Sequence, residues 1–85
     1  MSYQLFLKRS AEKELSELTG KTHDRIVKKL LEMRENPLPR GVRKLQGREG
    51  YRIRMGHYRI LYTIDETQKK IEIFSIAHRQ EVYKR

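Results

Sequence analysis

The sequence predicts an α+β fold in the order β-α-α-β-β-β, with an antiparallel four-stranded sheet packed against a helical hairpin. Two observations lead to this prediction. Apolar residues recur at helical spacing over residues 11–35, whereas apolar and polar residues alternate, as they do in strands, over much of residues 51–77. The length of 85 residues suits a single domain, 1–85, with a modest hydrophobic core.

The first half of the chain should hold one strand and the two helices. Tyr3–Leu7 is rich in aromatic and branched residues and is typical of a short strand. The helical segment that follows is interrupted at Gly20, a residue that often terminates helices. The second helix should end at Asn36-Pro37, because the residue before a proline is pushed out of the helical conformation.

The second half should hold three strands after a loop of prolines, glycines and cations over residues 37–50. They are expected at Tyr51–Met55, Tyr58–Asp65 and Lys70–Ala77. If the first strand runs up, the first helix runs down, the second helix runs up, and the second strand runs down. The first two strands are therefore antiparallel if they are neighbours. The two hairpins keep the remaining pairs antiparallel.

The first hairpin allows a residue-level prediction. Gly56-His57 is a two-residue connection with glycine first, the pattern of a type II′ turn. This turn would give five pairs: Met55 with Tyr58, Arg54 with Arg59, Ile53 with Ile60, Arg52 with Leu61, and Tyr51 with Tyr62. Side chains alternate between the faces of a strand. One face should therefore carry Tyr51, Ile53, Met55, Tyr58, Ile60 and Tyr62 against the helices, and the other should carry Arg52, Arg54 and Arg59.

Opposed like charges across a strand pair typically cost a few tenths of a kcal/mol to about 1 kcal/mol. No acidic residue of either strand shares the face with Arg52, Arg54 and Arg59. One interpretation is that these arginines only make an exposed face soluble. The interpretation that we favour is a phosphate site, because guanidinium groups bind phosphate oxygens through paired hydrogen bonds.

Composition narrows the classes of function. Twenty Lys and Arg residues against eleven Asp and Glu give a net charge of +9, which favours a polyanionic partner. The absence of cysteine excludes disulfides and thiolate zinc sites, and three scattered histidines give no metal or cofactor motif. No apolar run approaches the length of a membrane span or of a signal peptide core, so we expect a soluble cytoplasmic protein without a membrane partner.

The pattern "YRIRMGHYRILYTID…IEIFSIAHRQEVYKR" resembles the RelE/ParE superfamily of toxins from toxin–antitoxin systems, and its RelE branch more closely. "NP" after the second helix and "KLQG" before the strands extend the resemblance over essentially the whole chain. It implies a RelE-like fold and an endoribonuclease that enters the ribosomal A site and cuts mRNA by attack of a ribose 2′-hydroxyl. It also implies the ribosome, mRNA and a cognate antitoxin as partners.

The resemblance implies roles for particular residues. The catalytic positions of the family fall on Arg52, Arg54, Arg59, Arg79 and Tyr83. Tyr83 could stack on a base or donate a proton, or it could pack on the sheet as a tail aromatic. We also expect nucleic-acid contacts from Arg43, Lys44, His57 and Lys84.

One departure from the family concerns the proton acceptor. The best-known RelE-type toxins carry lysines at the positions of Arg52 and Arg54, and arginine does not accept protons in proteins. A histidine can, so His78 is our preferred general base. The alternative that His78 is an exposed residue without a role stays open. His57, Glu49 and Glu81 are the other candidates for the general base. Two alternative functions also stay open: a ParE-like inhibitor of DNA gyrase, and a basic binding module without catalysis.

Overall fold

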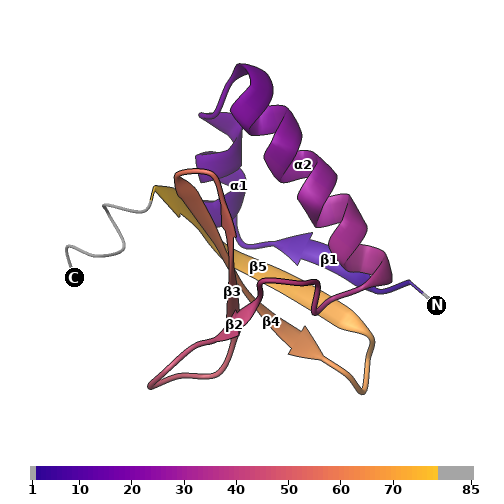
Figure 1. The fold of residues 1–85 in the computed structure, drawn as a ribbon. Helices are drawn as coiled ribbons and strands as arrows, with labels where there is room; N and C mark the ends of the chain where they lie inside the picture. Colours follow the sequence, from indigo (N-terminus) through magenta and orange to yellow (C-terminus); the bar gives the residue numbers. More distant parts are fainter. Residues whose placement is uncertain (1, 79–85) are drawn as a thin grey trace.

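The computed structural model describes residues 2–78 of the chain. These residues form an α+β structure, which confirms the predicted fold class (Figure 1). Both helices lie on one side of the sheet, and neither of them covers the other side, which we call the open face. The elements are β1 (Gln4–Leu7), α1 (Arg9–Ser16), α2 (Gly20–Glu35), β2 (Arg43–Lys44), β3 (Tyr51–Met55), β4 (Tyr58–Asp65) and β5 (Lys70–His78).

The sheet differs from the prediction in two details. It has five strands in the order β1-β5-β4-β3-β2, and its edge strand β1 is parallel to β5. Both differences come from β2, a two-residue strand within the loop that follows α2. This strand reverses the chain once more before β3 begins, so β3 runs in the direction opposite to the one counted from the helices. The pairs of β3 with β4 and of β4 with β5 are antiparallel, as predicted, and β2 also pairs antiparallel with β3.

The hydrophobic core lies between the two helices and the covered face of the sheet. Its fully buried members come mainly from α2 and from the strands β3 to β5: Ala11, Ile26, Leu30, Met33, Ile53, Ile60, Tyr62, Ile71, Ile73 and Ile76. Burying one such aliphatic side chain stabilises a fold by about 1.5–3 kcal/mol. This face of the sheet therefore dominates the choice of strand register.

Tyr62 connects the core to the loop that follows α2. Its side chain is completely buried, and its hydroxyl donates a hydrogen bond of 2.6 Å to the carbonyl oxygen of Pro37. Burial raises the pKa of this phenol above its ordinary value, so the hydroxyl stays protonated and able to donate. The start of the loop is thereby fixed to the middle of β4.

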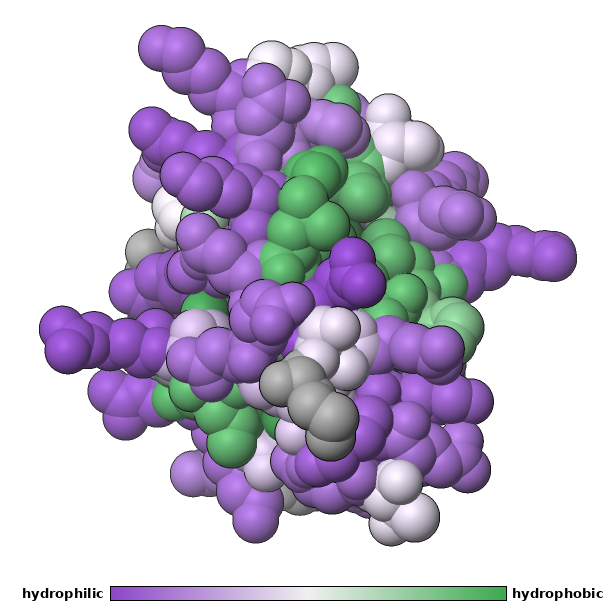
Figure 2. Space-filling model, turned by 90° about the vertical axis from the view of Figure 1, so that its right-hand side faces the viewer, coloured by the Kyte–Doolittle hydropathy of each residue, from purple (hydrophilic) through white to green (hydrophobic). Residues whose placement is uncertain are grey.

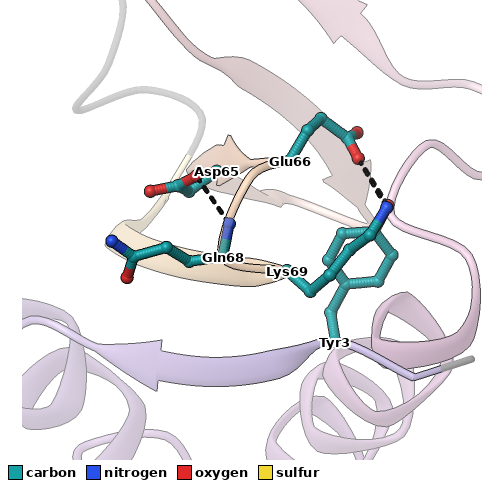
Figure 3. Close-up of polar contacts among 5 residues, drawn as sticks. All are labelled: Tyr3, Asp65, Glu66, Gln68 and Lys69. Atoms are coloured by element: carbon teal, nitrogen blue, oxygen red, sulfur yellow. Dashed lines mark hydrogen bonds and ion pairs between the residues drawn. The ribbon is translucent and has the colours of Figure 1, made fainter.

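The edge strand β1 is held at its start by the turn between β4 and β5 (Figure 3). Tyr3 donates from its hydroxyl to Glu66 over 2.8 Å, and Lys69 forms an ion pair with the same carboxylate at 3.4 Å. The hydrogen bond from Tyr3 is the main reason that the pKa of Glu66 lies below its ordinary value. The backbone N–H of Gln4 also donates to the carbonyl of Lys69 at 2.9 Å, which starts the parallel pairing.

The surface is densely ionic, as the composition requires. On the side of the molecule seen in Figure 2, hydrophilic side chains surround a narrow band of hydrophobic surface. Within residues 2–78, the large hydrophobic side chains that stay exposed are Phe6, Leu31 and Leu38. Neither described helix is long and apolar enough to cross a membrane.

Gly50 fixes where the loop joins β3. Its φ angle is +136°, a value that side-chain-bearing residues rarely adopt. A Cβ atom at this position would lie 2.9 Å from the carbonyl oxygen of Tyr62 and 3.0 Å from Leu45 Cδ1. The carbonyl of Gly50 also accepts a hydrogen bond from the N–H of Leu45 at 2.9 Å. The loop can therefore approach the sheet this closely only with glycine here.

We predict that Gly50→Ala lowers the free energy of unfolding by about 2–4 kcal/mol, since backbone strain of this kind costs about 1–3 kcal/mol and the contact with Tyr62 adds to it. Gly47→Ala is the matched control, because Gly47 also has a positive φ but nothing lies within 4 Å of its Cβ position. Urea denaturation of both variants measures the difference. Equal losses in the two variants would contradict the assigned role of Gly50.

Candidate nucleic-acid interface

The hairpin of β3 and β4 has the register predicted from its turn. All five predicted pairs are present, including Arg54 opposite Arg59 and Ile53 opposite Ile60. Gly56 has a φ of +59°, and His57 is not among the described residues with positive φ, as a type II′ turn requires. The turn therefore places the arginines of both strands on the open face of the sheet.

A second pair of arginines extends this face. Strand β2 pairs with β3 so that Arg43 lies opposite Arg52. A contact role for Arg43 is predicted from the sequence, but this pairing is not. A two-residue strand within a Gly- and Pro-rich loop has too few residues to show alternation. Two like-charged cross-strand pairs, Arg43–Arg52 and Arg54–Arg59, thus lie side by side on three neighbouring strands.

The four side chains surround one cavity, which we call the arginine pocket. Its volume is about 250 Å³, and the described residues that line it are Gly41, Arg43, Arg52, Arg54 and Arg59. Within residues 2–78, no carboxylate lines it, and none lies within ion-pair distance of Arg43, Arg52 or Arg54. The pocket therefore concentrates positive charge, which attracts anions from solution.

The arginines differ in how deeply they lie. Arg59 is only 3% exposed, Arg52 is half-buried, and Arg43 and Arg54 are exposed. The partner of Arg59 on β5 is Ala77. Alternation along β4 predicts the face on which Arg59 lies but not its burial. Buried stems hold guanidinium groups in fixed directions, an advantage for binding an oxyanion by paired hydrogen bonds.

The structure does not bring His78 into the arginine pocket. His78 pairs with Tyr58, on the strand face that carries the helices, and its ring lies 5.2 Å from the ring of Tyr58 and 6.0 Å from that of His57. The cause is a β-bulge in β5 opposite Leu61 and Tyr62 of β4. Leu61 pairs with Ser75 and Tyr62 with Ile73, so Phe74 is an extra residue that shifts the alternation of β5 by one.

The bulge itself is anchored from α1. Glu14 accepts a hydrogen bond of 2.7 Å from the backbone N–H of Ile76. Because of the bulge, His78 lies beside His57 near the tip of the hairpin, on the helix side of the sheet.

The remaining predicted residues are placed as follows. Lys44 follows Arg43 on β2 and is exposed, and Glu49 is exposed in the loop before β3. Arg79, Glu81, Tyr83 and Lys84 lie outside the described residues. No group of three or more histidine, aspartate or glutamate side chains within residues 2–78 could hold a metal ion.

Comparison with known proteins identifies the family. The family model described as the ParE toxin of the type II toxin–antitoxin system, parDE, matches residues 5–83. The chain therefore belongs to this family and is a toxin of the RelE/ParE type from a type II toxin–antitoxin system. No curated protein matches its sequence.

The fold is similar to those of solved RelE structures. The RelE–RelB complex from Pyrococcus horikoshii OT3 superposes with a TM-score of 0.83 at 28% identity, covering 93% of this chain and 97% of that one. The RelBE2 complex from Mycobacterium tuberculosis gives 0.80 at 26% identity, covering 93% and 100%. The isolated RelE toxin of E. coli gives 0.79 at 28% identity, covering 98% and 93%. These neighbours confirm the predicted RelE-like fold.

The pairing of Arg54 with Arg59 should affect the stability of the folded protein. Arg54→Thr should leave the isolated protein as stable as the wild type or up to about 1 kcal/mol more stable, because it removes a cross-strand repulsion at an exposed position. Arg59→Thr should lower stability, because it removes a stem that is packed in the fold.

Urea denaturation at low and at high salt measures both effects. The gain from Arg54→Thr should shrink at high salt, where exposed charges are screened. A loss of several kcal/mol for Arg54→Thr would instead mean that this arginine is needed for folding.

Proposed function

We propose that this toxin is a ribosome-dependent endoribonuclease that cleaves mRNA in the ribosomal A site and so stops translation in the cytoplasm. The observation that carries the proposal is the arginine pocket. Four guanidinium groups in two like-charged pairs converge on one cavity, without a carboxylate among its described lining residues. Such an arrangement has a clear use only when an anion binds there, and a phosphodiester of RNA suits it.

The reaction proposed is an internal phosphoryl transfer. The 2′-oxygen of a ribose attacks the adjacent phosphorus and loses its proton, and the bond from phosphorus to the 5′-oxygen breaks. The products are a 2′,3′-cyclic phosphate and a 5′-hydroxyl, which takes up a proton. Negative charge accumulates on the five-coordinate phosphorus centre, and fixed guanidinium groups facing it lower the barrier by several kcal/mol.

Proton transfer separates this toxin from RelE-type toxins with lysines on the corresponding strand. None of the four arginines can accept the proton of the 2′-hydroxyl. His78, the base expected from the sequence, faces the helix side of the sheet with His57. The toxin therefore supplies binding and charge, while Arg79 and Tyr83 remain proposed contributors beyond the described residues. The ribosome supplies the alignment of the attacking oxygen, which alone can account for much of a rate enhancement.

We also propose a cognate antitoxin as the partner of this chain. Two of the similar solved structures, from Pyrococcus horikoshii and Mycobacterium tuberculosis, are complexes of a toxin with its antitoxin. With a net charge of +9 and an arginine pocket whose described lining residues include no carboxylate, this toxin should be covered by an acidic or amphipathic segment.

Gyrase inhibition is the second candidate function, because the matching family model is the one described for ParE toxins. A gyrase inhibitor of this family would act by binding, and it would not need a phosphate pocket on the open face. The two candidates can be distinguished in one set of assays. Primer extension on programmed ribosomes detects cleavage, and a supercoiling assay detects inhibition of gyrase.

We predict that the wild-type toxin cleaves mRNA on programmed ribosomes and barely cleaves free RNA. Arg52→Thr should reduce single-turnover cleavage by about 10²- to 10³-fold, the usual effect of removing one group that stabilises transition-state charge. Lys28→Thr is the matched control, because it removes an exposed cation from α2 on the helix side. Equal cleavage of free RNA, or inhibition of supercoiling without any cleavage, would contradict the proposal.

A further inference from the structure

A second and larger cavity adjoins the arginine pocket. Its volume is about 610 Å³, and it shares Arg43, Arg52 and Arg59 with that pocket. The other described residues that line it are Lys44, Leu45, Gln46 and Leu61. We call it the leucine cavity. A ligand that binds the shared arginines through an anionic group can therefore extend into it, and so can be much larger than a phosphate.

Two leucines give this cavity an apolar surface. Leu61 lies on β4 opposite Arg52 of β3, on the open face and two residues after Arg59. Leu45 and Leu61 are both half-buried, so each presents part of its side chain to the cavity. A face that served only for solubility would have a charged or polar residue at position 61.

The apolar surface continues beyond the leucines to an aromatic ring. The Cβ position of Gly50 lies 3.0 Å from Leu45 and 3.5 Å from Phe74, so these two side chains are close neighbours. The guanidinium of Arg48 lies 4.1 Å from the centre of the Phe74 ring. Apolar and aromatic surface bordered by arginines and lysines is the combination that binds single-stranded nucleic acid, where cations contact phosphates and flat surfaces contact bases.

We propose that the leucine cavity is a nucleobase subsite, which receives the base of the nucleotide whose phosphate lies in the arginine pocket. This inference rests on the proposed function and adds to it the part of the substrate that the toxin itself contacts beyond the phosphate. The shared arginines bind the phosphate, and Leu61 and Leu45 cover one face of the base. Removing a flat apolar base from water against these side chains provides affinity that a phosphate alone cannot obtain.

The test compares ligands with and without a base on the isolated toxin. Binding of inorganic phosphate, ribose 5-phosphate and AMP is measured by NMR titration at fixed ionic strength. AMP should bind about tenfold more tightly than ribose 5-phosphate, within the range that one base contact usually contributes. A short single-stranded RNA should bind at least as tightly as AMP and should compete with it, since the subsite belongs to an RNA strand.

Variants at Leu61 locate the effect. Leu61→Thr should reduce the advantage of AMP over ribose 5-phosphate to less than about twofold and leave ribose 5-phosphate affinity unchanged. Leu61→Ile keeps an apolar side chain and should keep the advantage. Leu31→Thr is the control, because Leu31 is an exposed leucine of α2 on the helix side. The ratio of two affinities on one sample does not depend on how much of a variant is folded.

The outcomes separate this inference from the proposed function. If phosphate and ribose 5-phosphate do not bind, the arginine pocket is not an anion site and the proposed function fails with it. If both bind but AMP gains nothing, or if Leu61→Thr keeps the gain, the nucleobase subsite is overturned while the phosphate site stands. If AMP binds but the short RNA does not compete with it, the cavity does not serve an RNA strand and the inference is overturned.

Discussion

Two pairs of arginines, Arg43 with Arg52 and Arg54 with Arg59, face each other across neighbouring strands, and the proposed phosphate site depends on this arrangement. Each pair carries an unfavourable interaction of up to about 1 kcal/mol in the free protein. The opposite face of the same strands holds them in place. Ile53, Ile60 and Tyr62 are buried there, and each such side chain stabilises the register by about 1.5–3 kcal/mol.

This balance also explains why the arrangement cannot relax. A slip of one residue between β3 and β4 would separate the arginines, but it would also turn the isoleucines to solvent and the arginines towards the core. The type II′ turn at Gly56 and His57 leaves no room for such a slip. Burial of apolar side chains on the covered face therefore outweighs the repulsion on the open face and keeps the arginines together.

The position of β2 depends on contacts at the two ends of the loop that contains it. The hydroxyl of Tyr62 holds the carbonyl of Pro37 at the start of the loop, and Gly50 allows the end of the loop to approach β4 closely. Arg43 and Leu45 are positioned between these two points. The arginine pocket and the leucine cavity thus depend on the same loop, so a substitution that loosens the loop should impair both.

Much of this could be predicted from the sequence, because short-range rules governed it. The turn at Gly56 set the register of β3 and β4, and alternation then gave the two faces of the hairpin. The pairing of Arg43 with Arg52 could not be predicted, since β2 is too short to show a pattern. The parallel contact of β1 with β5 is a long-range pairing, fixed partly by the contacts of Tyr3 and Gln4 with the β4–β5 turn. The side of the sheet on which His78 lies could not be predicted, because the bulge at Phe74 is not visible in the sequence of β5.

The central claim is that the arginine pocket binds phosphate, and the salt dependence of binding to single-stranded RNA tests it most directly. For single strands, each phosphate contact contributes about 0.7 to the slope of log K against log salt concentration. Arg43→Thr, Arg52→Thr and Arg54→Thr should each make the slope shallower by about 0.7, whereas Lys28→Thr on α2 should leave it unchanged. An unchanged slope in the three arginine variants, or an equal change in the Lys28 variant, would contradict the account.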